Sequence, residues 1–162
     1  MDRKLRLYLE TTVFNYYFDE DREGHEDVVR LFSAIGAGQF EGYVSQYVTQ
    51  ELEKAPEPKR SNMLSLIDRY GIMFFNPGAE TVRLARIYIS VGAIPSSQGF
   101  DSLHIAAAGV YGLDCVVSYN FAHINRTKTR ELVANVNKYE KYGDIVICTA
   151  KEVLTYVCNG SH

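Results

Sequence analysis

The stretch that decides the fold is Phe100-Asp101-Ser102-Leu103-His104-Ile105-Ala106-Ala107-Ala108. An acid and a serine precede an apolar, alanine-rich run, which is typical of the beginning of a buried helix. Gly112 follows as a helix stop, and residues 114–118 then have the apolar composition of a short strand. This order predicts one unit of an α/β fold, and the same pattern continues on both sides of it.

Short strand-like segments alternate with helical segments along the whole chain. The predicted strands cover residues 5–9, 40–45, 72–75, 114–118 and 145–148, and the predicted helices cover residues 13–18, 26–35, 46–52, 63–70, 82–89, 101–111 and 149–154. The segment 121–139 is polar and predicts no regular element. The alternation predicts a three-layer α/β domain with a mainly parallel sheet of about four or five strands.

Length and composition limit the class of protein. The chain has 162 residues, 46% of them hydrophobic, which fits a single domain at 1–157 followed by a disordered tail at 158–162. A net charge of −3 provides no overall basic field that attracts nucleic acid. Three cysteines without metal-type spacing and no secretory signal predict a cytoplasmic protein with free thiols. No apolar run approaches the roughly 20 residues that span a bilayer, so no membrane partner is expected.

Four polar residues stand next to the predicted strands. Glu10 ends the first strand, and Glu51 lies in the helix after the second. Asp101 begins the helix before the fourth strand, and Asn120 follows that strand. The carboxyl ends of parallel strands meet at one edge of a sheet, so the four residues are predicted to converge there as a catalytic site. Two charges about 4 Å apart repel by roughly 4 kcal/mol at an effective dielectric of 20, so the three acids are predicted to bind Mg²⁺ or Mn²⁺.

Each of these residues also has a simpler interpretation. Glu10 alone is equally a solvated strand-end acid, Glu51 alone fits a surface helix position better, and Asp101 alone suits the first turn of a helix. Asn120 alone is typical of a turn, and His104 fits a core or boundary position better than the site. Only the joint arrangement favours a functional site.

Side chains that flank the four residues are predicted to support them or to contact the substrate; they are Thr11, Thr12, Ser118, His123, Asn125 and Arg126. The three hydroxyls are suited to capping and to hydrogen bonds with the site acids. His123 and Asn125 are expected to hold their loop. Arg126 and the basic residues after it fit phosphate contact and a solvated face equally. The sequence contains no glycine-rich phosphate loop and no Ser/His/Asp nucleophile motif.

Four motifs, in order, resemble those of the PIN domain family. They are Leu7-Tyr8-Leu9-Glu10-Thr11-Thr12-Val13-Phe14-Asn15, Val44-Ser45 followed by Thr49-Gln50-Glu51-Leu52, the opening stretch from Asp101 to Ala108, and Val116-Val117-Ser118-Tyr119-Asn120-Phe121-Ala122-His123-Ile124-Asn125. The resemblance covers about residues 5–155. It implies a Rossmann-like α/β/α fold with an acidic pocket that binds Mg²⁺ or Mn²⁺.

The resemblance also implies a metal-dependent endoribonuclease that hydrolyses RNA phosphodiester bonds. Many small VapC-like members are toxins of type II toxin–antitoxin pairs, so RNA, a small antitoxin protein and a second copy of the chain are the expected partners. Glu10 and Asn120 stand where the family usually has Asp, so the pocket holds three formal negative charges instead of four. The alternatives are a weak or inactive PIN-like module that binds RNA or protein, and an unrelated small-molecule-binding α/β domain.

Overall fold

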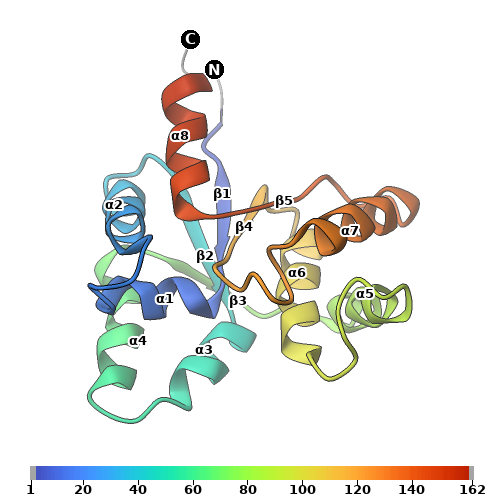
Figure 1. Ribbon diagram of the computed structural model, residues 1–162, viewed down its shortest axis with the longest axis horizontal. Helices are drawn as coiled ribbons and strands as arrows, with labels where there is room; N and C mark the ends of the chain where they lie inside the picture. The colour runs from blue at the N-terminus through green and yellow to red at the C-terminus, as the bar shows by residue number, and fades with distance from the viewer. Residues whose placement is uncertain (1–2, 161–162) are drawn as a thin grey trace.

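Five strands form one parallel sheet at the centre of the molecule (Figure 1). The computed structural model describes residues 3–160, and the side chains of residues 3–156. The strand order is β3-β2-β1-β4-β5, and all neighbouring strands are parallel. Their bounds are β1 (Arg6–Leu9), β2 (Glu41–Ser45), β3 (Met73–Phe75), β4 (Cys115–Val117) and β5 (Val146–Cys148). The predicted α/β fold with a parallel sheet is therefore confirmed.

Helices cover both faces of the sheet. Figure 1 shows α1, α2 and α4 on one side of the strands and α5, α6 and α7 on the other. In addition, α8 packs against α2, and α3 contacts α4 and α6. The bounds are α1 (Thr11–Phe18), α2 (His25–Gly36), α3 (Gln46–Glu53), α4 (Lys59–Arg69), α5 (Ala79–Ser90), α6 (Gly99–Tyr111), α7 (Thr127–Tyr139) and α8 (Ala150–Gly160).

The central strand β1 is covered on both faces. Leu7, Tyr8 and Leu9 have no exposed surface, and Leu7 is aligned with Gly42 of β2 and Cys115 of β4. A strand that is buried on both faces needs apolar residues without alternation, which is what this segment offers. The polar residue Glu10 comes directly after it and therefore lies at the carboxyl edge of the sheet.

The helix α6 holds the opening stretch of sequence against the sheet. Ala106, Ala107 and Ala108 are completely buried, and α6 packs against β4 and α5. Gly112 ends the helix with a φ of 74°, a conformation that glycine adopts without strain. The chain reverses between α6 and the parallel strand β4, so the first turn of α6 lies at the carboxyl edge of the sheet. Asp101 stands in that turn.

The structure corrects the sequence analysis at α7. Residues 127–139, inside the segment predicted to have no regular element, form a helix of 13 residues. Its buried side consists of Thr129, Val133, Val136 and Asn137, so half of the buried positions are polar. This composition conceals the apolar periodicity on which helix prediction depends.

The structure describes most of the C-terminal segment that was expected to be a disordered tail. The backbone of α8 is described to Gly160, and residues 161–162 of the expected tail lie outside the described residues. The domain boundary at 157 therefore stays a prediction.

Cys115 and Cys148 are buried free thiols, as expected. None of the helices in the described part of the chain has the length and hydropathy needed to cross a bilayer.

Candidate metal centre

Three side chains that could hold a cation meet at the carboxyl edge of the sheet. One ligand atom from each of Glu10, Glu51 and His104 lies within 4.8 Å of the other two. Glu10 follows β1, Glu51 stands in α3, and His104 stands in α6. Residues that are far apart in sequence are thus brought together by the ends of the strands, as the topology of a parallel sheet dictates.

Glu10 is anchored by hydroxyl groups. It is only 3% exposed, and its Oε1 accepts hydrogen bonds from Oγ1 of Thr12 at 2.6 Å, from the backbone N–H of Thr12 at 3.2 Å, and from Oγ of Ser118 at 2.7 Å. Burial raises the pKa of Glu10, while His104, Thr12 and Ser118 favour its charged form. The carboxylate is therefore fixed in place but poorly solvated, which is the situation that a cation relieves.

Glu51 is held from two sides. Its Oε1 accepts a hydrogen bond from Oγ1 of Thr11 at 2.5 Å and lies 2.6 Å from Nε2 of His104. Burial acts to raise the pKa of Glu51, but the interactions with His104, Thr11 and Lys54 outweigh it, so the pKa lies below its usual value. Glu51 is therefore the member of the acidic group that is most readily ionised in the folded protein.

Asp101 lies beside this trio without being one of its three members. The residue is 8% exposed, and its Oδ2 atom is buried without a hydrogen-bond partner. Burial raises the pKa of Asp101, His104 opposes this, and the neighbouring Glu51 adds to it. A buried carboxylate oxygen without a donor costs free energy unless a cation or a donor reaches it.

Asn120 shapes the loop that follows β4. Its Oδ1 accepts a hydrogen bond from the backbone N–H of His123 at 3.1 Å, and its own N–H donates to Oγ of Ser118 at 3.0 Å. The side-chain amide also favours the charged form of Asp101. The side-chain oxygen of Asn120, a predicted catalytic residue, is thus engaged in a turn.

The remaining predicted residues hold the same loop. Asn125 donates from Nδ2 to the carbonyl oxygen of Ser118 at 3.0 Å and accepts from Arg130 at 2.6 Å. Arg126 donates to Oγ1 of Thr129 at 2.8 Å and to the carbonyl oxygen of Ala93 at 3.3 Å. The guanidinium groups of half-buried Arg126 and exposed Arg130 are therefore both engaged in hydrogen bonds within the protein. The Nδ1 atom of His123 is buried without a hydrogen-bond partner.

Sequence reasoning missed three members of the site's hydrogen-bond network. Tyr8 was given no role, Ser45 was expected only at the start of a helix, and His104 was expected at a core or boundary position. His104 is indeed completely buried, but Oη of Tyr8 lies 2.6 Å from its Nδ1 and 2.7 Å from Oγ of Ser45. Two spacings in the sequence indicated these residues. Tyr8 lies two strand residues before Glu10, and His104 lies one helical turn after Asp101, so each shares a face with a site acid.

The donor set fits a divalent cation. Glu10 and Glu51 bring carboxylate oxygens to one small region, and Asp101, whose pKa responds to Glu51 and His104, has an oxygen without a hydrogen-bond partner. Carboxylate oxygens suit hard ions such as Mg²⁺ and Mn²⁺. Such a site can bind an anionic substrate and place a water molecule next to it, which is the arrangement needed for hydrolysis of a phosphate ester.

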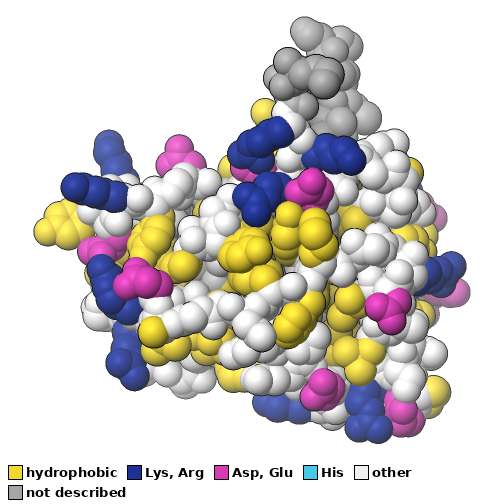
Figure 2. Space-filling model, turned by 180° about the vertical axis from the view of Figure 1, so that it is seen from behind, with side chains coloured by type: hydrophobic (Ala, Val, Ile, Leu, Met, Phe, Trp, Pro, Cys, Tyr) yellow, Lys and Arg dark blue, Asp and Glu magenta, His cyan; other side chains and the backbone are white. Residues whose placement is uncertain are grey.

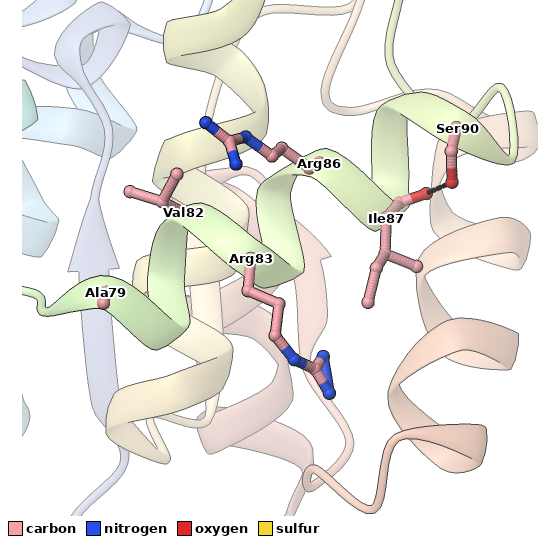
Figure 3. A pocket seen from close by; sticks show the side chains of 6 residues that line it. All are labelled: Ala79, Val82, Arg83, Arg86, Ile87 and Ser90. Carbon is pink, nitrogen blue, oxygen red and sulfur yellow. Dashed lines mark hydrogen bonds between the residues drawn. The ribbon is translucent and has the colours of Figure 1, made fainter.

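A depression elsewhere on the surface offers no comparable chemistry. It has a volume of about 610 Å³ and is lined by Ala79, Val82, Arg83, Arg86, Ile87 and Ser90. Figure 3 shows that all six side chains come from α5. Arg83 is paired with Glu140 at 2.6 Å and with Glu80 at 3.7 Å. No carboxylate, imidazole or thiol is among the lining residues, so the carboxyl edge of the sheet remains the candidate site.

Comparisons with known proteins agree with this fold. The family model described as PIN domain matches residues 7–129. A search of curated protein sequences found no match. Among solved structures, the chain resembles one in a VapBC2 complex from Rickettsia felis bound to a promoter DNA fragment, with 12% identity, a TM-score of 0.53, and coverage of 88% of this chain and 97% of the other.

The chain also resembles one in a solved structure of DNA-bound VapBC from Salmonella typhimurium, with 16% identity and a TM-score of 0.54. This match covers 90% of this chain and 98% of the other. At these identities the likeness concerns the fold alone. The family model, however, spans most of the chain, from β1 through β4 to the beginning of α7. The chain therefore belongs to the PIN domain family.

Proposed function

We propose that this protein is a metal-dependent endoribonuclease that hydrolyses RNA phosphodiester bonds. The observation that carries the proposal is the cluster at the carboxyl edge of the sheet. Ligand atoms of Glu10, Glu51 and His104 lie within 4.8 Å of one another, and Asp101 presents an unpartnered buried oxygen beside them. Membership of the PIN domain family supports the same activity.

The proposed roles follow from the hydrogen bonds. Glu10, Glu51 and Asp101 would hold Mg²⁺ or Mn²⁺, which when bound supplies positive charge for the phosphodiester and acidifies water. Thr12 and Ser118 keep Glu10 in place. Asn120 closes the loop after β4 and favours the charged form of Asp101. These contacts preorganise the oxygens, so little ordering remains to be done when the cation binds.

A cation is also needed to attract the substrate. The chain has a net charge of −3, and Arg126 and Arg130, at the beginning of α7, donate hydrogen bonds to other residues of the protein. We therefore assign Arg126 to holding the loop, with Asn125 and His123, rather than to contacting phosphate. Removing the cation should weaken RNA binding as well as cleavage, because the three acids would then repel the phosphate backbone.

We also propose that the protein is the toxin of a type II toxin–antitoxin pair, acts in the cytoplasm, forms a homodimer and binds a small antitoxin protein. The two similar solved structures come from VapBC complexes. Apolar surface for such contacts is present: Figure 2 shows hydrophobic side chains gathered across the middle of the rear face. Met73 and Phe74 of the edge strand β3 are 43% and 51% exposed. Light scattering of the purified protein tests the dimer.

The enzyme proposal is tested with purified protein and a panel of single-stranded RNAs, with Mg²⁺, with Mn²⁺ and with a chelator. We expect metal-dependent cleavage that Asp101→Asn abolishes. Asp68→Asn is the matched control, because Asp68 is an exposed acid in α4 and should leave cleavage unchanged. If no RNA is cleaved and calorimetry detects no Mn²⁺ binding, the protein is instead an inactive PIN-like module.

A further inference from the structure

A continuous line of hydrogen bonds runs from β2 to Glu51 through the centre of the fold. Oγ of Ser45 lies 2.7 Å from Oη of Tyr8, and this Oη lies 2.6 Å from Nδ1 of His104. Nε2 of His104 lies 2.6 Å from Oε1 of Glu51. Ser45, Tyr8 and His104 have no exposed surface, so water does not compete for these bonds.

The donor and the acceptor of each hydrogen bond can be assigned by starting from the carboxylate of Glu51. An ionised carboxylate only accepts, so the proton between His104 and Glu51 belongs to Nε2. In a neutral imidazole the other nitrogen then accepts, so the hydroxyl of Tyr8 donates to Nδ1. Ser45 in turn donates to Tyr8, and its Oγ accepts from the backbone N–H of Tyr47 at 3.2 Å. Each donor in this line therefore donates one hydrogen bond, and the neutral His104 carries its proton on Nε2.

This arrangement separates two possible roles of His104. Its position within 4.8 Å of Glu10 and Glu51 would allow it to be a metal ligand. Both of its ring nitrogens are already engaged, however, one with Tyr8 and one with Glu51. A neutral imidazole with one N–H donated and one lone pair occupied has no lone pair left for a cation.

We propose that His104 is a positioning residue that holds the carboxylate of Glu51, and that Tyr8 fixes the tautomer and ring orientation of His104. The proposal rests on the proposed function, since it concerns the same site. The hydrogen bonds from Thr11 and His104 both end on Oε1 of Glu51, so Oε2 would be the oxygen available to a cation. The bonds to Glu10 also end on its Oε1, so both glutamates are anchored through one oxygen and present the other.

Removal of the Tyr8 hydroxyl tests the proposal without removing any group that would touch the cation. We expect Tyr8→Phe to weaken Mn²⁺ binding by about 10-fold or more in calorimetry, which is the usual effect of losing such a support. Tyr88→Phe is the matched control, because Tyr88 is equally buried and donates to Oδ1 of Asn137 at 2.5 Å, far from the site. It should lower thermal stability and leave Mn²⁺ affinity unchanged. Equal Mn²⁺ affinity in Tyr8→Phe and the wild type would overturn the proposal.

Two spectroscopic measurements distinguish a positioning residue from a ligand. In the metal-free protein, ¹⁵N spectra should show His104 with the proton on Nε2, and Tyr8→Phe should mix the tautomers. A proton on Nδ1 in the wild type would overturn the proposal. In the Mn²⁺-loaded protein, pulsed electron paramagnetic resonance should show no directly bonded imidazole nitrogen, and such a coupling would also overturn it. If the wild type binds no Mn²⁺, the proposed function fails, whereas the metal-free spectra still decide the role of His104.

Discussion

Substitution of Glu10 by Gln should stabilise the metal-free protein while removing its response to metal. The charge of Glu10 is buried, and burial raises its pKa. Its ligand oxygen lies within 4.8 Å of that of Glu51. In Glu10→Gln the Oε1 atom can still accept the hydrogen bonds from Thr12 and Ser118. The new amide group can donate to Glu51, so a repulsion is replaced by an attraction.

The magnitude follows from the distance. Two full charges 4.8 Å apart repel by about 3.5 kcal/mol at an effective dielectric of 20. His104 lies 2.6 Å from Glu51, and the hydrogen bond that it donates offsets part of this cost. We therefore expect a gain of about 1–2 kcal/mol in the free energy of unfolding, of the order of half the full repulsion. For a chain of this size the gain corresponds to a rise of about 2–8 °C in Tm.

The effect should depend on pH in a defined direction. The folded-state pKa of Glu10 lies above its usual value of 4.5, so the folded protein pays a penalty when this group ionises. Below pH 4.5 the group is protonated in both states, and Glu10→Gln should bring no gain. The gain should grow as the pH rises from 4.5 through the folded-state pKa and be complete above it. Urea unfolding at pH 4 and pH 7.5, with chelator, measures both limits.

Asp114→Asn provides a control of opposite sign. Arg3 binds Asp114 at 2.6 and 2.7 Å and lowers its pKa below the usual 3.8. This pair should contribute stability above pH 3.8 that is lost as the pH falls through the lowered pKa, and its exposure limits the loss in the variant to about 1 kcal/mol.

With 5 mM Mn²⁺, the Tm of the wild type should rise and the Tm of Glu10→Gln should not. A metal-free Glu10→Gln that is less stable than the wild type at pH 7.5 would refute the reasoning.

Three further predictions concern other parts of the molecule. Gly112→Ala should cost about 1 kcal/mol of unfolding free energy in urea, because its φ of 74° strains any other residue; an unchanged midpoint would contradict this. Ser118→Ala should weaken Mn²⁺ binding about 10-fold in calorimetry, since Glu10 loses a donor. Phe121, 54% exposed and adjacent to Asn120, should stack a base; in an Asp101→Asn background Phe121→Ala should weaken RNA binding in fluorescence anisotropy, while Tyr139→Ala, 84% exposed in the wild type, should not.

Local signals in the sequence were sufficient for most of the fold. The run from Leu7 to Leu9 is apolar because β1 is buried on both faces, and Ser45 caps α3 by accepting from the N–H of Tyr47. Such features act within a few residues, so they are legible without a structure. The helix α7 was missed because two of its buried positions, Thr129 and Asn137, form hydrogen bonds with the loop after α5 and with α5 itself. Those partners are visible only after the chain has folded.

The same distinction applies to the site. Glu10, Glu51 and Asp101 could be placed at one edge because strand ends in a parallel sheet converge. The contact between His104 and Glu51 joins residues 53 positions apart on two helices. It depends on how each helix is rotated about its axis, and composition does not determine that rotation. The position of a candidate acid was therefore predictable, whereas the hydrogen bonds that hold it were not.

Asn120, which stands where the PIN domain family usually has Asp, also has a role that only the structure shows. Its oxygen accepts from the N–H of His123, and its side chain favours the charged form of Asp101. An aspartate could close the turn but would set a negative charge against Asp101, whose pKa burial already raises. The amide therefore lowers the negative charge of the site by one unit and avoids a repulsion with Asp101. With Glu10 and Glu51 also anchored through single oxygens, the site relies on fixed positions more than on total charge.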